Sequence, residues 1–449
     1  MYRNIYFIGI GGIGMSAIAR YWKFKGLTVS GYDKTPSDLT ASLEKEGIAV
    51  HYEDDVNYIP KDIENTLVVY TPAIPESLGE LKYVKEHGYS VLKRSQILGE
   101  ITRGQTCLAV AGTHGKTTTS TLTAHIVTES GEGCSAFLGG ISKNYGTNML
   151  VSHRPTVVVE ADEYDRSFLQ LHPAVAAITA MDADHLDIYG DLEHVQEAFR
   201  KFASQVSGTL VMKLGLPISQ KDTKAKIYTY HVDDPRADFH AENITLGDLG
   251  HYTFDLVYPQ GRIDGLKAGA LGRVNVENSV AAAAVCLCHG VRIEAIRSGI
   301  ASFQGVQRRM DVHVNRPGLT YIDDYAHHPQ ELATAIASLR GIFPGRKITA
   351  VFQPHLYSRT RDFAKQFAQA LSAVDKLIIL DIYPAREEPI PGVTSELIFQ
   401  DVTAPEKVMM HKEDVLEALR GENLDVLVTF GAGNIDRLVG PITEMLETR

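Results

Sequence analysis

The sequence lacks the cysteine content of a disulfide-stabilised or zinc-binding protein. It has four cysteines in 449 residues, and none of them forms a C-x-x-C pair. Cys286 and Cys288 are two positions apart, so on a helix their side chains point in different directions. Cys107 and Cys134 stand alone in the sequence. We therefore expect buried thiols rather than disulfides or metal ligands.

The sequence also lacks an excess of positive charge. Lysine and arginine total 44, aspartate and glutamate total 55, and the formal net charge is −11. Broad nucleic-acid binding requires a basic face, so we expect no nucleic-acid partner. Phosphate ligands remain possible, because a few local donors can hold them.

Long hydrophobic runs are missing as well, since none approaches the ~20 residues of a membrane-spanning helix. The N-terminal "MYRNIYFIGIGGIGMSAIA" does combine Arg3, an apolar run and Ala17-x-Ala19, as a signal peptide would. Its glycines fit a strand, a turn and a helix better. We expect a cytoplasmic protein without a membrane partner, and the sequence leaves both a monomer and a homodimer open.

Short apolar strands alternate with helices along most of the chain. Periodicity of this βαβ kind predicts an α/β fold with parallel sheets covered by helices. The length suggests about three domains, which we place at residues 1–104, 105–306 and 307–449. Strands are expected at 4–10, 27–33, 66–71, 106–112, 156–162, 174–184, 225–232, 251–258, 319–326, 347–354, 375–383 and 425–433. Helices are expected at 15–24, 117–130, 275–290, 292–303 and 330–343.

The first glycine motif is Gly9-x-Gly11-x-x-Gly14, between a predicted strand and a predicted helix. Its glycines let the backbone approach a diphosphate at the helix N-terminus, where N–H groups favour anions. Asp33 ends the next strand, where a ribose hydroxyl could bind. On the motif alone this is an NAD site, and a tight turn without a ligand is the alternative.

The second motif, "AVAGTHGKTTTS" at 109–120, resembles a phosphate-binding loop with Val110 in place of its first glycine. Lys116 supplies a charge for the β- and γ-phosphates, and the Thr117 hydroxyl can bind Mg²⁺. A helix preceded by a threonine-rich cap is the alternative. An ATP loop together with a diphosphate loop suits an enzyme that uses ATP on a substrate carrying its own nucleotide diphosphate.

The chain resembles the Mur ligases over nearly its whole length. The motifs that carry this resemblance are "GIGGIGMS", "AGTHGKTTT", "EADEYDRSFL", "DADHLDIY", "GRVNVENSVAAAA", "GVQRRM", "DDYAHHPQE" and "VFQPHLYSRTRDF". The resemblance implies a Rossmann-like N-terminal domain for a UDP-linked substrate, a central P-loop domain for ATP, and a Rossmann-like C-terminal domain for an amino acid. It implies Mg²⁺-dependent ligation of L-alanine to UDP-N-acetylmuramic acid through an acyl phosphate, in peptidoglycan precursor synthesis.

Some motifs also match family members that recycle a murein tripeptide. "EADEYD" is shared with those members, whereas residues 9–16 and "QPHLYSRTRDF" follow the alanine-adding form. Three positions depart from the family pattern: Val274 replaces a histidine, Leu356 replaces an arginine, and "HYED" at 51–54 replaces a Gly-His pair. Two alternatives from other functional classes remain: an NAD-dependent oxidoreductase and a non-catalytic ATP-binding switch.

The resemblance assigns the site residues by position. For the UDP-linked substrate they are Gly11, Gly12, Ile13, Gly14, Met15, Ser16, Asp33, Thr71, Ala73, Ile74, Thr147 and Asn148. For ATP they are Gly112, Thr113, His114, Gly115, Lys116, Thr117, Thr118, Asn275, Asn278, Arg309 and Asp324. For Mg²⁺ they are Thr117, Glu160 and His185, and for the amino acid they are Tyr325, His327, His355 and Arg359. The catalytic set is Lys116, Glu160, His185, His327 and His355.

Each assignment has a plainer alternative. Asn275 could cap its helix rather than bind adenine, and Arg309 could belong to a solvated charged pair with Arg308. Either His327 or His355 could accept the amine proton, or serve only a structural role.

Overall fold

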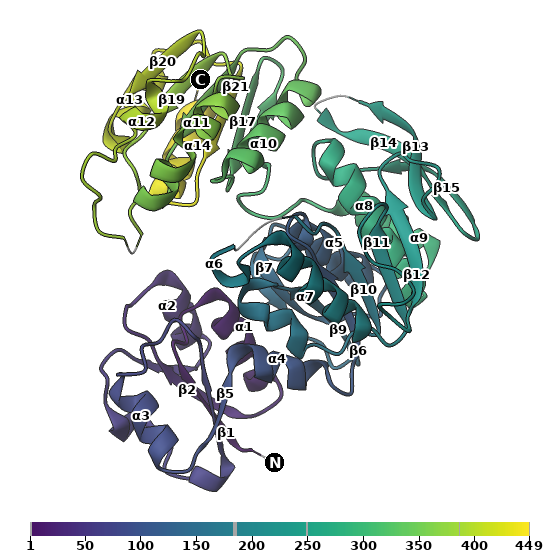
Figure 1. Ribbon diagram of the computed structural model, residues 1–449, viewed down its shortest axis with the longest axis vertical. Coiled ribbons are helices and arrows are strands. Elements are labelled where there is room, and N and C mark those ends of the chain that lie inside the picture. The colour runs from purple at the N-terminus through teal and green to yellow at the C-terminus, as the bar shows by residue number, and fades with distance from the viewer. Residues whose placement is uncertain (1, 183–185, 248–249, 386, 449) are drawn as a thin grey trace. The chain divides into compact units, whose positions relative to one another are not determined.

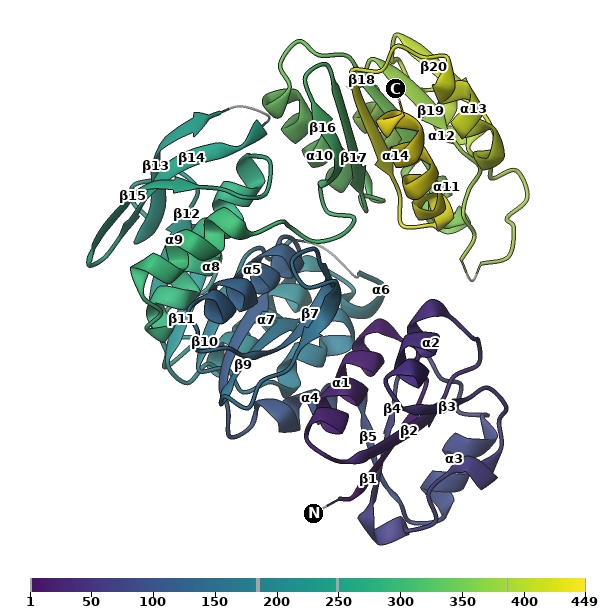
Figure 2. The same cartoon turned by 180° about the vertical axis from the view of Figure 1, so that it is seen from behind.

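The computed structural model describes residues 2–182, 186–247, 250–385 and 387–448. These residues form three β-sheets with helices packed on their faces (Figures 1 and 2). The chain divides into two compact units. One comprises Met1–Glu242, Asp255–Leu266 and Glu277–Phe303, and the other comprises Asn243–Phe254, Lys267–Val276 and Gln304–Arg449. Within the described residues, no helix has both the length and the apolar character needed to cross a membrane.

The N-terminal sheet has five parallel strands in the order β3-β2-β1-β4-β5, as a Rossmann-like fold requires. Residues of β1 alternate between its two faces: Ile5 and Phe7 pack with α1 and α4, whereas Tyr6 and Ile8 pack with α3. Its elements are β1 (Asn4–Ile8), α1 (Ile13–Phe24), β2 (Thr28–Tyr32), α2 (Asp38–Lys45), β3 (Ala49–His51), β4 (Thr66–Tyr70), α3 (Gly79–Glu86), β5 (Ser90–Lys93) and α4 (Arg94–Thr102).

The central sheet has ten strands in the order β15-β14-β13-β12-β11-β10-β6-β9-β7-β8. Its first part contains β6 (Thr106–Ala111), α5 (Lys116–Glu129), β7 (Ser135–Ser142), β8 (Thr147–Leu150), β9 (Thr156–Ala161) and β10 (Val175–Ile178). Then follow α6 (Leu186–Tyr189), α7 (Leu192–Ser204), β11 (Thr209–Lys213), β12 (Lys226–His231), β13 (Phe239–Leu246), β14 (Tyr252–Tyr258), β15 (Gly261–Lys267), α8 (Arg273–His289) and α9 (Ile293–Ser302).

The C-terminal sheet has six strands in the order β16-β17-β21-β18-β19-β20. All neighbours are parallel except β16 and β17. Its elements are β16 (Asp311–Arg316), β17 (Leu319–Asp324), α10 (Pro329–Ile342), β18 (Ile348–Phe352), α11 (Tyr357–Leu371), β19 (Lys376–Ile379), α12 (Glu396–Phe399), β20 (Glu406–Met409), α13 (Val415–Arg420), β21 (Val426–Phe430) and α14 (Val439–Glu447).

The predicted fold class is confirmed, while several predicted strands are too long, two of them markedly so. The strand expected at 174–184 is only Val175–Ile178, because the next backbone groups bond to the ATP loop instead. The Thr179 N–H donates to the Ala111 carbonyl, and the Ala180 carbonyl accepts from the Thr113 N–H. The strand expected at 375–383 is only Lys376–Ile379. The hairpin of β7 and β8 was not predicted at all.

Candidate active site

The first glycine loop follows β1 and is held by the neighbouring strand. The N–H groups of Gly9 and Ile10 both donate to the Tyr32 carbonyl, at 2.8 and 2.9 Å. A Cβ at Gly9 would lie 3.1 Å from side-chain carbons of both Thr71 and Ile74. The structure therefore brings these two predicted substrate residues against the loop, and Ala73 lies in the exposed turn between them.

Asp33 is bound to the loop. Its Oδ2 accepts a hydrogen bond from the Gly11 N–H at 2.7 Å, and its Oδ1 accepts one from the Thr35 N–H at 3.2 Å. The carboxylate thus fixes the loop conformation. Its contact with a ribose stays a prediction.

The segment 143–148 reaches the same loop. The Asn148 side-chain amide donates to the Ile13 carbonyl at 2.9 Å, and the Ser16 hydroxyl donates to that carbonyl at 3.0 Å. Gly12 caps α1, Met15 is buried beneath the loop, and Thr147 is half-buried beside Asn148. Two segments that are far apart in sequence therefore meet at one end of α1.

Arg94 is a cation at this loop that sequence reasoning missed. A Cβ at Gly14 would lie 2.7 Å from Arg94 Nη1, so a larger residue there would displace the guanidinium from its present position. Arg94 is half-buried and has neither an ion pair nor a hydrogen bond within the described residues. The N-terminus of α1 and this guanidinium together favour an anion. The signal in the sequence is only "KRSQ" at 93–96.

The ATP loop joins β6 to α5, and its glycines make room for neighbouring backbone. Gly112 has φ +140°, and a Cβ there would lie 2.1 Å from Thr179 Oγ1 and 2.8 Å from the Ala180 nitrogen. Gly115 adopts a left-handed conformation and caps α5, which begins at Lys116. Val110, the departure from the usual motif, is buried within β6. Val110 is therefore part of strand β6, and the turn of the loop begins only after it.

Lys116 and Thr117 each contact a carboxylate of the segment 160–163. Lys116 Nζ donates to Glu163 Oε1 and Thr117 Oγ1 donates to Glu160 Oε1, both at 3.0 Å. Glu160 Oε2 accepts from the Gly139 N–H at 2.9 Å. Burial alone lowers the pKa of Lys116, but the surrounding carboxylates outweigh this effect and raise it. Burial raises the pKa of Glu160.

Other predicted ATP residues surround the loop. His114 is exposed, and its Nε2 lies 3.5 Å from Asp182 Oδ2, while Thr113 Oγ1 accepts from the Asp182 N–H at 3.1 Å. Thr118 lies in the first turn of α5. The Asn278 side chain accepts from the Thr119 hydroxyl at 3.2 Å, so it packs against α5. His185, the predicted second Mg²⁺ ligand, lies outside the described residues, as does Asp184.

Asn275, Arg309 and Asp324 lie in the second compact unit. The Asn275 amide donates to the Leu271 carbonyl at 2.7 Å. The Arg309 guanidinium lies 5.1 Å from the centre of the Tyr325 ring. Burial raises the pKa of Asp324 to about 6, although Arg309 and the N–H groups of Met310 and Ala326 oppose this rise.

The four predicted amino-acid residues cluster after β17 and β18. The rings of Tyr325 and His327 lie 5.1 Å apart, and those of His327 and His355 lie 5.7 Å apart. Burial, together with the nearby His327 and Arg359, lowers the pKa of His355 to about 4. Burial also lowers the pKa of His327. Both imidazoles are therefore held neutral beside a guanidinium.

The two histidines differ in their partners. His327 Nδ1 lies 3.0 Å from the Tyr325 carbonyl and 3.3 Å from Glu331 Oε2. The buried Nδ1 of His355 has no hydrogen-bond partner within the described residues. His355 instead stacks on Tyr383, with ring centres 5.8 Å apart. Tyr383 was not predicted as a site residue, although "YPAREE" marks its segment.

The sequence comparisons decide the family. Residues 4–106 match "Mur ligase family, catalytic domain", residues 110–286 match "Mur ligase middle domain", and residues 308–433 match "Mur ligase, glutamate ligase domain". The UDP-N-acetylmuramate–L-alanine ligase of Parabacteroides distasonis is 52% identical over 98% of this chain and 97% of that protein. The chain belongs to the Mur ligase family.

Solved structures of other Mur ligases agree with the fold. The UDP-N-acetylmuramate–alanine ligase of Thermotoga maritima matches with a TM-score of 0.82 at 25% identity, covering 99% of both chains. A murein peptide ligase of Psychrobacter arcticus matches with a TM-score of 0.67 at 21% identity, also covering 99% of both chains. The second likeness shows the fold alone.

In this Mur ligase the departure at Leu356 coincides with backbone strain. Leu356 has φ 73° and ψ 136° and caps α11 in the middle of the predicted amino-acid site. Its N–H donates to the Tyr383 carbonyl at 3.0 Å, and its carbonyl accepts from the Thr360 hydroxyl at 2.9 Å. These bonds hold a conformation that L-residues rarely adopt.

The other departure with a clear structural role is at 51–54. His51 Nε2 lies 2.8 Å from Oε1 of the fully buried Glu80, and the Tyr6 hydroxyl donates to Glu80 Oε2 at 2.5 Å. Asp54 accepts the N–H groups of Gly79 and Glu80 at the start of α3. The "HYED" segment therefore stabilises the inside of the N-terminal domain of this Mur ligase.

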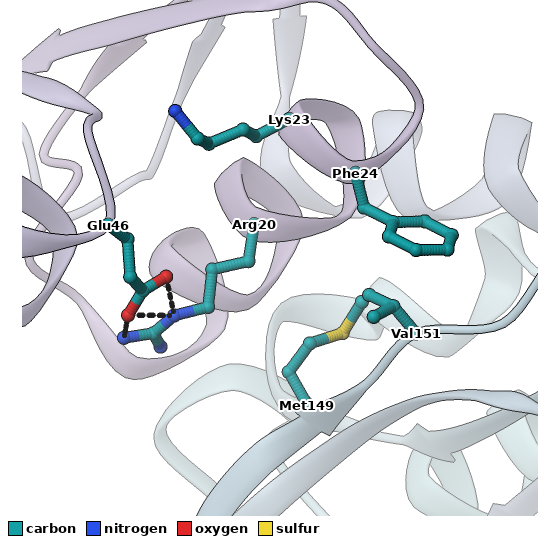
Figure 3. Close-up of a pocket in the computed structure, with 6 residues that line it drawn as sticks. All are labelled: Arg20, Lys23, Phe24, Glu46, Met149 and Val151. Carbon is teal, nitrogen blue, oxygen red and sulfur yellow. Dashed lines mark hydrogen bonds and ion pairs between the residues drawn. The ribbon is translucent and has the colours of Figure 1, made fainter.

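A surface hollow of about 370 Å³ lies between α1 and β8, away from both loops. Both of its cations already have partners. Arg20 forms a forked ion pair with Glu46 (Figure 3), and Lys23 donates a hydrogen bond to the Gly47 carbonyl. The hollow is lined by Arg20, Lys23, Phe24, Glu46, Met149 and Val151. No residue of either glycine loop lines it.

Proposed function

We propose that this Mur ligase joins L-alanine to UDP-N-acetylmuramic acid with cleavage of ATP to ADP and phosphate, in peptidoglycan precursor synthesis. The full-length relative at 52% identity carries the proposal. The paired phosphate loops support it, because they suit ATP and a UDP-linked substrate. We assign UDP-substrate binding to residues 1–104, ATP binding to 105–306 and amino-acid binding to 307–449, and we place the reaction in the cytoplasm, where ATP is available.

The chemistry requires activation of a carboxylate, which is unreactive toward amines. Transfer of the γ-phosphoryl group gives an acyl phosphate with a good leaving group. The amine of L-alanine then attacks, and phosphate leaves. Because both nucleotide and substrate are anionic, cations must stabilise the charge that moves between them. Lys116 would supply one cation at the ATP loop, and the family resemblance assigns Arg309 as a further phosphate contact.

The residues present fit Mg²⁺. The Thr117 hydroxyl and the Glu160 carboxylate lie 3.0 Å apart, and both are oxygen ligands of the kind that Mg²⁺ prefers. When bound, Mg²⁺ would neutralise the phosphate oxygens during transfer. We assign His185 to a second ion near the substrate carboxylate, as the family resemblance implies. Gly139 would orient Glu160 through its N–H group.

At the amino-acid site we assign the alanine carboxylate to Arg359 and the amine proton to His355. Arg359 offers a guanidinium for forked binding of a carboxylate. His355 is favoured over His327 because its Nδ1 has no partner in the described part of the chain, whereas His327 Nδ1 lies near Tyr325 and Glu331. A neutral imidazole can accept the proton that the attacking amine releases.

The decisive experiment measures phosphate release from ATP and Mg²⁺ with UDP-N-acetylmuramic acid, with and without L-alanine. We expect release only when both substrates are present. Release with L-alanyl-γ-D-glutamyl-meso-diaminopimelate but not with L-alanine would assign the tripeptide-recycling reaction instead. No release in either case, from folded protein, would refute the ligase function, and NADH titration would then test the dinucleotide alternative.

A further inference from the structure

Three side chains from distant parts of the first compact unit meet beside the ATP-loop helix. His125 lies on α5, Tyr145 lies in the turn between β7 and β8, and Ser302 ends α9 (elements in Figure 1). His125 Nδ1 lies 2.7 Å from the Tyr145 hydroxyl, and its Nε2 lies 2.8 Å from Ser302 Oγ. None of the three belongs to the predicted site.

The hydrogen bonds around Ser302 determine the direction of the others. The Ser302 hydroxyl donates its single proton to the Ser298 carbonyl at 2.8 Å. Ser302 Oγ must therefore accept from the Nε2–H of His125. The remaining imidazole nitrogen, Nδ1, is then an acceptor, so the Tyr145 hydroxyl donates to it. The chain of donors runs from Tyr145 through a neutral His125 to Ser302 and Ser298.

The burial of His125 fixes the protonation state of this hydrogen-bonded network. Only 2% of His125 is exposed, and burial lowers its pKa, which keeps the imidazole neutral. A buried imidazole costs free energy unless both nitrogens are satisfied, and an apolar side chain would fill this space at lower cost. The presence of histidine at position 125 is thus better explained by the positions in which it holds Tyr145 and Ser302.

Close helix packing brings Ser302 to His125. A Cβ at Gly299 would lie 2.8 Å from a side-chain carbon of Ile126, so glycine allows α9 to approach α5 next to His125. Phe303, the following residue, places its ring 5.9 Å from the imidazole. The first compact unit ends at Phe303, and the chain continues from there into the second.

The turn that carries Tyr145 is also tied to α9 and to the first glycine loop. Asn144 Nδ2 donates to the Ser302 carbonyl at 2.8 Å. Gly146 closes the turn with a 2.8 Å bond from its N–H to the Ser142 carbonyl. At the other end of the segment, Asn148 donates to the Ile13 carbonyl. Segment 143–148 is therefore fixed at both ends.

We propose that Tyr145 and His125 are positioning residues, which hold segment 143–148 in register with the ATP-loop helix so that Thr147 faces the muramic acid part of the substrate while the buried Asn148 stays bound to the first glycine loop. This inference rests on the proposed function for the identity of the substrate. The hydrogen-bonded network also anchors the segment in the absence of substrate, which can be measured independently.

The test compares Tyr145→Phe and Ser302→Ala with wild type and with Tyr89→Phe. Tyr89 is a matched control, because its hydroxyl donates one hydrogen bond to the Pro60 carbonyl at 2.9 Å, in the N-terminal domain. Kinetics would give KM for UDP-N-acetylmuramic acid, KM for ATP, and kcat. Amide hydrogen exchange would follow peptides covering 143–148 in the substrate-free protein.

For both test variants we expect KM for UDP-N-acetylmuramic acid to rise about tenfold, as loss of one hydrogen bond implies, with KM for ATP unchanged. Exchange at 143–148 should become faster, and Tyr89→Phe should change neither quantity. The combined variant should shift KM by less than the product of the single effects, because both changes break one network.

Two results would overturn the proposal. If Tyr145→Phe keeps KM and hydrogen exchange at the levels of Tyr89→Phe, the network has no positioning role. If KM for both substrates rises together, the effect is general destabilisation. If wild type itself is not a ligase, the proposed function fails, and hydrogen exchange alone then decides the anchoring: unchanged exchange refutes it and faster exchange supports it.

Discussion

Lys116 and Glu163 form a buried ion pair beside the ATP loop, with Nζ and Oε1 3.0 Å apart and with 16% and 1% of the two side chains exposed. The lysine that would bind phosphates is therefore neutralised by a carboxylate when no nucleotide is bound. ATP must bring its own negative charge to this already paired lysine. We therefore expect Glu163 to oppose ATP binding while it keeps Lys116 charged and positioned.

We expect Glu163→Gln to bind ATP more tightly, by roughly tenfold, because one negative charge near the phosphates is removed. Turnover should fall, since Lys116 loses the carboxylate that positions it. Titration calorimetry with magnesium-free ATP measures the affinity. Glu406→Gln is the matched control, since it breaks the Lys347–Glu406 pair of 2.9 Å on the C-terminal sheet. Weaker ATP binding by Glu163→Gln would show that the pair assists binding.

Gly112→Ala should abolish ATP binding and lower the thermal midpoint. The new Cβ would overlap Thr179 Oγ1 and press on the Ala180 backbone, in a conformation that alanine rarely adopts. Gly131→Ala provides the comparison, because Gly131 also has positive φ, +81°, but has no atom within 4 Å of its Cβ position. Equal effects of the two variants on the thermal midpoint would mean that backbone conformation, not contact with Thr179, makes glycine necessary.

Arg94→Met should raise KM for UDP-N-acetylmuramic acid by about ten- to a hundredfold and leave KM for ATP unchanged, because the cation beside the first glycine loop, which we expect to bind the diphosphate, is lost. KM for Arg94→Lys should lie between the values for wild type and for Arg94→Met, because lysine keeps the positive charge but cannot form the paired hydrogen bonds of a guanidinium. Arg103→Met serves as the control, because Arg103 pairs with Glu100 at 3.0 Å and is exposed. A parallel rise in both KM values would contradict a specific diphosphate contact.

The free energy of unfolding of the second compact unit should depend on pH through Asp324. Its pKa is about 6 in the folded state, above the ordinary value of 3.8, so the folded state holds the proton more tightly than the unfolded state. The resulting stabilisation is largest at low pH and is lost as pH rises through about 6. Relative to Asp324→Asn, wild type should lose about 1 kcal/mol in the free energy of unfolding between about pH 5 and about pH 8.

Urea unfolding followed by circular dichroism at several pH values would measure this difference. The substitution also changes the hydrogen bonds that the N–H groups of Met310 and Ala326 make. This change adds a constant, which does not vary with pH, to the difference in the free energy of unfolding. Asp401→Asn, at an exposed position, is the control for loss of a carboxylate elsewhere in the same unit. A difference for Asp324→Asn that grows in the opposite direction would mean that Asp324 is ionised more readily in the folded state.

Much of the fold follows from local patterns in the sequence. Alternating apolar residues predict the strands, and glycine spacing predicts the two loops, because these features act within a few neighbouring residues. The strand at 174–184 was predicted too long, since a β-like pattern cannot show that Thr179 and Ala180 bond to another loop. The β7–β8 hairpin was missed because "FLGGIS" contains glycines that interrupt the strand pattern.

The sequence by itself determined the α/β class and predicted both loops, with Lys116 and Thr117 at the start of a helix, because each feature depends on residues adjacent in the chain. Only the tertiary structure decided which distant groups meet them. Strand β9 pairs with β6 and sets Val110 beside Glu160, although β7 and β8 lie between them in sequence. The same strand order brings Glu163 to Lys116, and helix packing brings Arg94 to Gly14 and His125 to Ser302. Such contacts depend on strand order and helix packing, which no local pattern specifies.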